Sequence, residues 1–378
     1  MASSPQYVLV TGATGFIGAH VVDQLLSRGI RVRGTTRSLA KGEAMSKARP
    51  QYAGKLDFVQ ISDFDQMNNN EEQLNMFNEA VKGVDGIIHT ASPLTYNTTN
   101  NEAELILPAI NGVRAILTAA AAVNRDPSSS TKIRRVVLTS SFAAVMDASR
   151  KAPPYFTYTA ADWNPLSYAE AAHPSTSAII AYRGSKKFAE LAAWDFVRDN
   201  NQNVDNDNNK INNKNAGFDL VTLCPPMTFG PVVHPVESVE QLNESNAMLW
   251  KVATSGRGKG EGEGGGGSLP VARVPFWVDV RDVARAHVEA LVRPEAGGKR
   301  FLPAAPERFT YALAAHIVEE EFDWARGKVA KEEQVVDTSH GVDGETAARE
   351  LGLEYKSFRQ TVTELVAQAA RMKGSGLP

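Results

Sequence analysis

The feature that most constrains this chain is a glycine-rich turn near its N-terminus, set between an apolar run and an amphipathic segment. Tyr7-Val8-Leu9-Val10 is a β-rich run that stops at Thr11-Gly12-Ala13-Thr14-Gly15-Phe16-Ile17-Gly18. Apolar residues then recur at helical spacing as far as Gly29, and residues 30–35 read as a second strand. Strand, glycine turn, helix and strand in this order predict the first half of a nucleotide-binding βαβ unit.

The three glycines of the turn have a physical reason. Amide groups at a helix N-terminus bind a pyrophosphate only where no side chain blocks its approach. We expect Gly12 to make the tight turn, Gly15 to let the phosphate approach, and Gly18 to let helix and strand pack closely. A glycine-rich helix start without a ligand is the simpler alternative, which the flanking strand and helix disfavour. Further candidate cofactor contacts in the same turn are Thr14, Phe16 and Ile17.

The end of the second predicted strand selects among the nicotinamide cofactors. An NAD site usually has an acid there, which binds the ribose hydroxyls. Here the residues are Thr35-Thr36-Arg37-Ser38, without an acid. The planar cation of Arg37 suits a 2′-phosphate, and Lys41 adds a second charge one helical turn on. NADPH/NADP is therefore the expected cofactor, and a pair of solvated surface cations is the alternative.

Apolar runs recur along the rest of the chain at α/β spacing. They predict strands at 56–61, 86–91, 135–139 and 218–223, and helices at about 102–123 and 179–197. Such alternation predicts an α/β fold: a Rossmann-type doubly wound parallel sheet with a smaller mixed C-terminal substrate lobe. We expect residues 1–224 to form the NADP-binding Rossmann core that carries the catalytic residues. Residues 225–378 would form the lobe, interleaved with the core in one structural unit.

Composition narrows the classes of function. The net charge of −3 offers no basic excess for nucleic acid or an anionic membrane. A single cysteine, Cys224, excludes an intramolecular disulfide and a cysteine-based zinc cage, and the seven histidines show no ligand spacing, so we expect no metal. No apolar run approaches the ~20 residues of a membrane span and no secretory signal is visible, so we expect a cytoplasmic protein. The Asn-rich stretch 200–215 and the Gly-rich stretch 256–268 are expected to be exposed insertions.

Candidate catalytic residues lie on a predicted helix and at a predicted strand end. Tyr182 and Lys186 are four residues apart, so they share one helix face, and a nearby ammonium lowers the pKa of a phenol. This spacing is common by chance, and an exposed pair is the alternative. Ser140 and Ser141 directly follow the strand 135–139, where ligands of open α/β sheets bind. A serine there can donate to a carbonyl oxygen as negative charge develops.

Five stretches of the chain together resemble the extended short-chain dehydrogenases/reductases. Within them the chain resembles the dihydroflavonol-reductase-like group, and in particular fungal NADPH-dependent methylglyoxal, aldehyde and ketone reductases. The matching stretches are 11–18, 89–93 (His-Thr-Ala-Ser-Pro), 136–145, 181–190 and 278–284. Cys224, before Pro225, departs from the asparagine that this group often carries. The resemblance implies a carbonyl reductase (alcohol dehydrogenase) that takes a small-molecule carbonyl substrate, as a monomer or homodimer.

The resemblance also implies roles for individual residues. Tyr182 resembles the general acid, Lys186 its partner on the nicotinamide ribose, and Ser141 the serine that orients the substrate. Asn111 resembles an asparagine that interrupts the fourth helix, although a plain polar helix residue is nearly as good an interpretation. Asp282 stands at the start of a predicted helix, where an N-cap role explains it, and we leave it out of the site. Further implied cofactor contacts are Asp63 and Phe64 beside the adenine, Ala91 and Ser92 along the cofactor path, and Pro225.

The sequence also offers candidate residues for a substrate pocket and leaves two alternative functions open. Apolar residues near the expected sheet edge suit an apolar ketone or aldehyde, although half of them could be ordinary core. They are Phe142, Met146, Phe156, Pro226, Met227 and Trp250. One alternative function is an NAD-dependent nucleotide-sugar epimerase or dehydratase of the same fold, which Arg37 disfavours. Another is a non-catalytic NADP-binding sensor or scaffold protein, which the Tyr182–Lys186 pair disfavours because such proteins commonly lose it.

Overall fold

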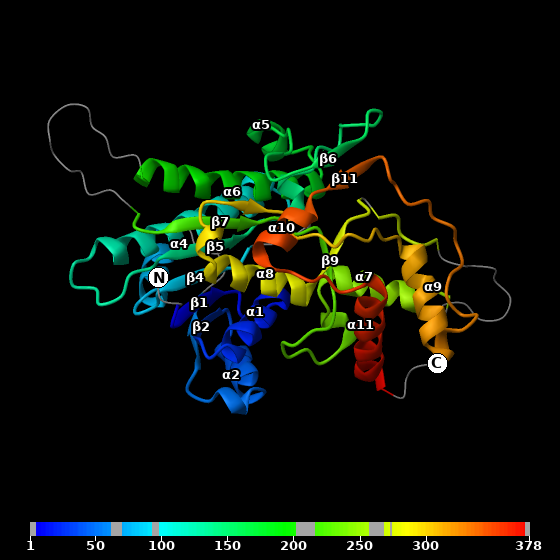
Figure 1. Cartoon of the computed structure of the whole chain (residues 1–378), viewed down its shortest axis with the longest axis horizontal. Coiled ribbons are helices and arrows are strands. Elements are labelled where there is room, and N and C mark those ends of the chain that lie inside the picture. The colour runs from blue at the N-terminus through cyan, green and yellow to red at the C-terminus, as the bar shows by residue number, and fades with distance from the viewer. Residues whose placement is uncertain are drawn as a thin grey trace.

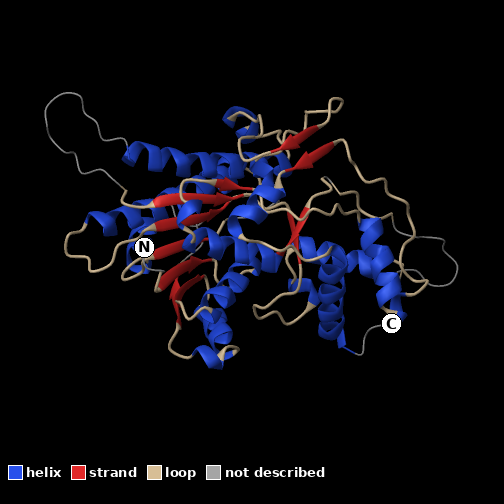
Figure 2. Ribbon diagram, in the orientation of Figure 1, coloured by secondary structure: helices blue, strands red, loops and turns tan. Residues whose placement is uncertain are grey.

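A seven-stranded parallel sheet in the order β10-β7-β5-β4-β1-β2-β3 forms the centre of the computed structural model. The structure describes residues 5–61, 70–92, 98–201, 216–256, 268–272 and 274–374. The strands are β1 (Tyr7–Thr11), β2 (Arg31–Thr36), β3 (Leu56–Gln60), β4 (Gly86–His89), β5 (Arg135–Thr139), β7 (Asp219–Leu223) and β10 (Arg300–Phe301). Figures 1 and 2 show this sheet between two layers of helices. The α/β Rossmann-type fold expected from the sequence is confirmed.

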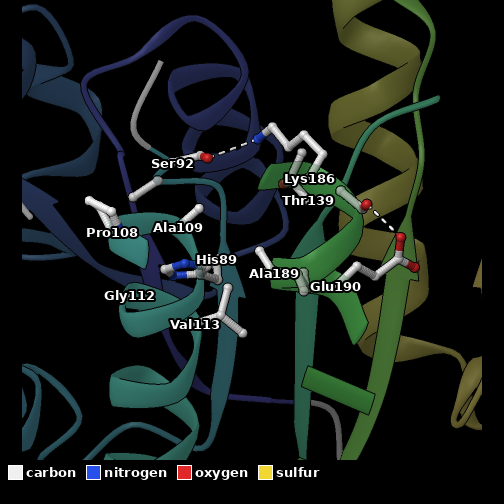
Figure 3. Close-up of a pocket in the computed structure, with 13 residues that line it drawn as sticks. His89, Ser92, Pro108, Ala109, Gly112, Val113, Thr139, Lys186, Ala189 and Glu190 are labelled. Atoms are coloured by element: carbon white, nitrogen blue, oxygen red, sulfur yellow. Dashed lines mark hydrogen bonds between the residues drawn. The ribbon is translucent and has the colours of Figure 1, made fainter. Parts of the chain in front are cut away.

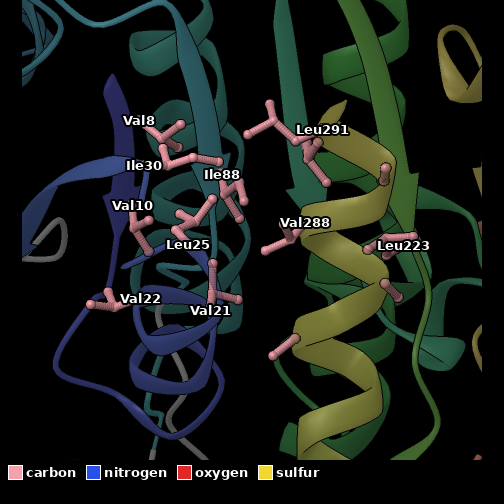
Figure 4. Packing of buried hydrophobic residues seen from close by; sticks show 14 of the residues in the cluster. Val8, Val10, Val21, Val22, Leu25, Ile30, Ile88, Leu223, Val288 and Leu291 are labelled. Atoms are coloured by element: carbon pink, nitrogen blue, oxygen red, sulfur yellow. The ribbon is translucent and has the colours of Figure 1, made fainter. Parts of the chain in front are cut away.

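Both faces of the sheet are covered, which explains why its strands are apolar on both sides. Val8 and Val10 of β1 pack against α1 (Phe16–Ser27) and α8 (Val280–Val292), as Figure 4 shows. Leu9 points to the opposite face, because side chains alternate along a strand. That face is covered by α3 (Asn70–Ala80), α4 (Leu107–Arg125) and α6 (Ala178–Asn201). The helix α2 (Leu39–Lys47) packs beside β2 and β3.

The helix expected at about 102–123 begins with an irregular turn and contains a longer apolar stretch than expected. It begins with a π-helical turn, Glu102–Ile106, directly before α4. Pro108, which has no N–H to donate, stands in the first turn of α4. By length and by a mean hydropathy of 1.6, residues 102–125 could cross a membrane, which corrects the expectation that no run approaches that length. More than half of this apolar stretch is buried inside the protein, against α3 and α6, as in a core helix.

The later part of the chain forms a helical lobe and also completes the central sheet. In the lobe, β8 (Met227–Phe229) pairs with β9 (Trp277–Asp279) under three helices that share one apolar cluster. These helices are α7 (Glu244–Ala253), α9 (Tyr311–Glu321) and α11 (Phe358–Lys373). A second small sheet pairs β6 (Phe156–Tyr158) with β11 (His340–Val342). The short helix α5 (Tyr168–Ala172) packs against α6, and α10 (Gly344–Leu351) packs against α8. Residues 202–215 and 257–267, which hold most of the two expected insertions, lie outside the described residues.

Candidate active site

The glycine turn between β1 and α1 has the geometry expected of a phosphate-binding turn. Gly12 has a φ of +65°, in the left-handed region that favours glycine. A Cβ on Gly18 would lie 2.2 Å from the Gly12 carbonyl oxygen, so only glycine lets the helix approach the turn this closely. Gly15 is the N-cap residue of α1, and within the described part of the chain no side chain caps that helix end. This end of α1 therefore fits a pyrophosphate.

The two remaining residues of the turn connect it to the rest of the protein. Ile17 is half-buried and packs against the core cluster under α1 and α8. Phe16 is also half-buried and packs against a buried apolar cluster of the lobe, which consists of Val232, Val239, Leu242 and Ala369. The segment that binds the cofactor is thus in direct apolar contact with the lobe that follows it.

The end of β2 lies beside this turn and carries two exposed cations. The Thr14 and Thr36 hydroxyl oxygens are 3.4 Å apart, which brings the turn and the strand end together. The Thr36 hydroxyl also donates to the Ser38 carbonyl at 2.9 Å, which fixes the bend that carries Arg37. Arg37 and, in the first turn of α2, Lys41 are both exposed. Cations placed beside a pyrophosphate turn fit the 2′-phosphate of NADP.

The end of β4 is tied to the end of β1 by a buried threonine that sequence reasoning passed over. The Thr11 hydroxyl oxygen lies 2.9 Å from His89 Nδ1 and accepts the Ala91 N–H at 3.1 Å. A Cβ on Gly12 would come within 3.1 Å of the Ala91 backbone, so Ala91 borders the glycine turn, as expected. Burial lowers the pKa of His89 to about 3, so its ring is neutral at physiological pH. Thr11 and His89 both lie within the stretches that resemble the family. The sequence signal that pointed to them is a polar side chain at the ends of two adjacent strands, β1 and β4.

Ser141 and Tyr182, far apart in the sequence, meet at the carboxyl end of β5. Ser141 has an extended backbone, and its hydroxyl oxygen accepts the Ala143 N–H at 3.1 Å. Its side chain lies within hydrogen-bonding reach of Tyr182 on α6. Burial raises the pKa of Tyr182, the bond to Ser141 opposes that rise, and the negative charge of Glu244 adds to it. Glu244, the first residue of α7, had no signal in the sequence that linked it to this site.

Lys186 lies one turn beyond Tyr182 on α6. Its ammonium nitrogen is 5.7 Å from the centroid of the Tyr182 ring and donates to the Ser92 hydroxyl oxygen at 2.9 Å (Figure 3). Burial lowers the pKa of Lys186 to about 8. We expected Lys186 to make Tyr182 more acidic. In this structure the pKa of Tyr182 is raised instead, because burial outweighs the hydrogen bond to Ser141.

A pocket lies between the end of β4, the start of α4 and α6, and Lys186 forms part of its wall (Figure 3). Its other lining residues include His89, Ala91, Ser92 and Gly112. Two of these, Ala91 and Ser92, are expected cofactor contacts. The pocket therefore adjoins the place where the sequence puts the cofactor.

The two serines after β5 have different partners. The Ser140 hydroxyl donates to a carboxylate oxygen of buried Glu190 at 2.6 Å, as the dashed line in Figure 3 shows. Ser141 bonds Tyr182 instead. The choice of Ser141 as the serine beside the tyrosine therefore agrees with the geometry. Glu190 itself lay inside the motif at 181–190 without a role assigned to it.

The expected substrate residues separate into core residues and half-buried residues. Phe142 and Phe156 are 3% and 8% exposed and pack edge-to-face against Tyr158, so they belong to the core in this structure. An apolar aromatic residue looks the same in the sequence whether it lines a pocket or fills a core, and this explains the misplacement. The half-buried ones remain candidate pocket residues: Met146, Pro226, Met227 and Trp250.

Five other residues were singled out from the sequence, in or near the expected site. Pro225 is buried beside the site, and its carbonyl accepts the Phe142 N–H at 2.9 Å. The helix that contains Asn111 is interrupted at Glu102–Ile106 and runs regularly through position 111. The N-cap of α8 is Asp279, which accepts the Arg281 N–H, and not Asp282. Asp63 and Phe64 lie outside the described residues.

Fold and site together define a dinucleotide-dependent oxidoreductase, with a phosphate-binding turn, a cationic strand end and a Ser-Tyr-Lys group at one sheet edge. The model of the NAD dependent epimerase/dehydratase family matches residues 8–190. An uncharacterized oxidoreductase of Schizosaccharomyces pombe is 35% identical over 94% of both chains. The NADPH-dependent methylglyoxal reductase of Saccharomyces cerevisiae is 29% identical over 97% of this chain and 99% of its own. The chain belongs to the extended short-chain dehydrogenase/reductase family.

Further relatives support the same group. An Aspergillus niger ketoreductase is 33% identical over 81% of this chain and 79% of its own. The crystal structure of the yeast methylglyoxal/isovaleraldehyde reductase complexed with NADPH superimposes with a TM-score of 0.81 at 28% identity, over 97% of this chain and 99% of that chain. The relatives bear out the expected class, an NADP-dependent oxidoreductase acting on CH–OH and C=O groups, and the expected cofactor.

Proposed function

We propose that this protein reduces aldehydes or ketones to alcohols with NADPH, and that Tyr182 donates the proton. The observation that carries the proposal is the hydrogen bond between Tyr182 and Ser141 at the carboxyl end of β5, with Lys186 one helical turn away. This arrangement puts a proton donor and a hydroxyl group where a substrate oxygen would lie in an open α/β sheet. The names of the relatives, a methylglyoxal reductase and a ketoreductase, support the same reaction.

Tyr182 holds its proton at neutral pH, as reduction requires, because the ordinary pKa of a phenol is ~10 and burial raises that of Tyr182 further. A phenol that titrates above its ordinary value stays protonated at neutral pH, so the proton is present when negative charge develops on the carbonyl oxygen. The bound cofactor supplies the hydride to the carbonyl carbon. Tyr182 gives its proton to the oxygen, and Ser141 hydrogen-bonds the same oxygen as its charge grows.

Lys186 and the cations after β2 would bind the cofactor. Although burial lowers the pKa of Lys186 to about 8, the ammonium is still the main form at pH 7. It would bind the nicotinamide ribose, as the family resemblance implies, beside Ser92. Arg37 and Lys41 would bind the 2′-phosphate and so select NADPH over NADH.

The surroundings of Tyr182 narrow the substrate class. Met146, Pro226, Met227 and Trp250 are half-buried and apolar, which suits an apolar carbonyl compound. The charge of Glu244 is close enough to raise the pKa of Tyr182, so it would also repel a substrate that carries a carboxylate near its carbonyl group. We therefore expect neutral aldehydes, ketones and diketones to react better than 2-oxo acids.

The test is NADPH consumption, followed by the loss of its near-ultraviolet absorbance, with a panel of neutral aldehydes, ketones, diketones and 2-oxo acids. The proposal predicts turnover with neutral carbonyl compounds and little with NADH. NADPH binding without turnover of any panel member would contradict it and favour a non-catalytic sensor. Epimerisation or dehydration of a nucleotide sugar with retained NAD would replace it with another reaction.

A further inference from the structure

A buried ion pair lies directly beneath the candidate catalytic residues. Glu190 of α6 and Arg300 of β10 are joined by two hydrogen bonds, Nε to Oε1 at 2.8 Å and Nη2 to Oε2 at 3.1 Å. Their side chains are 0% and 7% exposed. Taking two charges out of water is costly, and a buried pair often stabilises a fold no better than apolar residues would. The pair therefore needs a reason other than stability.

The Glu190 carboxylate collects donors from the strands on which the site is built. Ser140 after β5 donates to it at 2.6 Å, and Thr222 of β7 donates at 2.7 Å. The Cys224 thiol lies 3.5 Å from the same carboxylate. Glu190 stands four residues after Lys186, so one side chain ties the catalytic helix to the ends of two strands.

The Arg300 guanidinium extends this contact to the loop on the other side of the site. It donates to the Ala160 carbonyl at 3.0 Å and lies 3.8 Å from the centre of the Trp163 ring. The next residue, Asn164, donates to the carbonyl of Ala143 at 2.8 Å and to that of Arg183 at 3.1 Å. Ala143 and Arg183 are close neighbours of Ser141 and Tyr182 in the sequence. The network thus reaches the catalytic pair from two sides.

We propose that the Glu190–Arg300 ion pair is a positioning pair, which fixes Ser140 against α6 and thereby aims the neighbouring Ser141 at Tyr182. Successive side chains of an extended backbone point in opposite directions, and Ser141 has an extended backbone. Holding the Ser140 hydroxyl on Glu190 therefore determines where the Ser141 hydroxyl points. The role of the pair in turnover rests on the reductase function proposed above; its effect on the Ser141–Tyr182 hydrogen bond does not.

The test compares Glu190→Leu, Arg300→Met and the double variant. Each single variant leaves a buried charge without its partner, so both stability and kcat fall. The double variant removes both charges and should recover most of the lost stability. Its kcat should remain about ten- to a hundred-fold low, because catalytic groups that are held less well lose rate in this range. NADPH affinity should fall less than kcat, because the glycine turn and the cations expected to bind its phosphates lie at β1 and β2, whereas the pair joins α6 to β10.

A matched control exists at the opposite end of the same strands. Arg135 of β5 and Asp219 of β7 form an ion pair, with Nη2 to Oδ2 at 2.8 Å, at the amino end of the sheet. The double variant Arg135→Met with Asp219→Leu should change stability and leave kcat of the folded protein unchanged. A Glu190→Leu/Arg300→Met protein with wild-type kcat would show that the buried pair has a structural role only.

A readout without turnover separates this proposal from the proposed reaction. Tyrosine labelled with ¹³C at Cζ, assigned with Tyr182→Phe, reports the hydrogen bond to Ser141. The double variant should move the Tyr182 signal to the position found in Ser141→Ala, and the Arg135/Asp219 control should not move it. An unmoved signal would overturn the positioning role even if the protein reduces carbonyl compounds, and a moved signal would support it even if no substrate is found.

Discussion

At the scale of single residues, different hydrogen-bond partners give neighbouring residues of the same type different roles. Ser140 and Ser141 carry the same hydroxyl group, but Ser140 donates to Glu190 and Ser141 bonds Tyr182. A phenol with the ordinary pKa of ~10 is already protonated at neutral pH, and burial raises the pKa of Tyr182 further. Lys186 keeps its charge close by although burial lowers its pKa. The chemistry of the site therefore follows from which polar groups remain beside the substrate once the buried ones have found partners.

Cofactor selection is a residue-scale prediction. Arg37→Asp should raise the dissociation constant of NADPH by about ten- to a hundred-fold, because charge-assisted hydrogen bonds contribute roughly 1.5–3 kcal/mol. NADH, which lacks the 2′-phosphate, should bind about as before. Fluorescence titration with both cofactors checks this, and Lys47→Asp, an exposed cation at the other end of α2, is the control. Equal weakening of both cofactors by Arg37→Asp would exclude the 2′-phosphate contact.

The pH dependence of stability has a residue-scale contribution from Asp282. Burial raises its pKa from 3.8 to about 6, although its carboxylate accepts the Lys356 N–H at 2.8 Å. Between these two pKa values the folded protein binds more protons than the unfolded chain, so the free energy of unfolding falls as pH rises. The full difference corresponds to about 3 kcal/mol.

Asp282→Asn should abolish this part of the pH dependence. Relative to the wild type, the variant should become more stable by up to about 3 kcal/mol as pH rises from 4 to 7, because it carries no charge to bury. Denaturant unfolding of both proteins at the two pH values gives the difference. Parallel stability curves for the two proteins would contradict the raised pKa.

At the scale of elements, the close approach of α1 to the glycine turn is what makes the cofactor site. Gly18→Ala should cost more than about 2 kcal/mol of stability and most of the NADPH affinity, since its Cβ would lie 2.2 Å from a backbone oxygen that cannot move aside. Gly29→Ala is the matched control after the same helix: it has a φ of +80° but nothing within 4 Å of its Cβ. It should cost roughly 1–2 kcal/mol and leave NADPH affinity unchanged. Equal loss of affinity in both variants would contradict the steric argument.

The elements also show which parts of the fold could be predicted from the sequence. The central strands β1, β2, β3, β4, β5 and β7 were predictable because each is an apolar run bounded by turn residues. The edge strand β10 was not, because it has only two residues and its partner β7 lies about eighty residues earlier. The three-residue strands β6 and β11 escaped for the same reason, since they pair across more than 180 residues. Short strands leave no periodicity to recognise, and their pairing is decided by tertiary contacts.

The site was predictable to a similar degree. Tyr182, Lys186 and Ser141 carry a recognisable spacing and place, whereas Glu244 and Arg300 reach the site only through the tertiary fold. The core positions of Phe142 and Phe156 show the complementary limit: apolar character alone does not distinguish a pocket wall from a core.

At the scale of the whole molecule, core and lobe are interdependent because the chain crosses between them. The helix α8 and the strand β10, both beyond residue 224, cover and extend the central sheet, and β11 pairs with β6 of the earlier part. We predict that residues 1–224 alone do not fold to a native state, because the face of the sheet that α8 covers would be exposed. Near-ultraviolet circular dichroism and amide hydrogen exchange of this fragment check the prediction. A cooperative, NADPH-binding fragment would show that the core is an independent domain.

We propose that Tyr182 donates the proton to the carbonyl oxygen of the substrate. The most direct test of this proposal is single-turnover reduction by Tyr182→Phe, which keeps the ring and removes the hydroxyl group, with NADPH binding measured on the same sample. We expect a loss of about 10²–10⁴-fold in the rate of reduction, the range of general acid catalysis, with NADPH affinity nearly unchanged. A Tyr182→Phe protein that binds NADPH and reduces the substrate at the wild-type rate would contradict it.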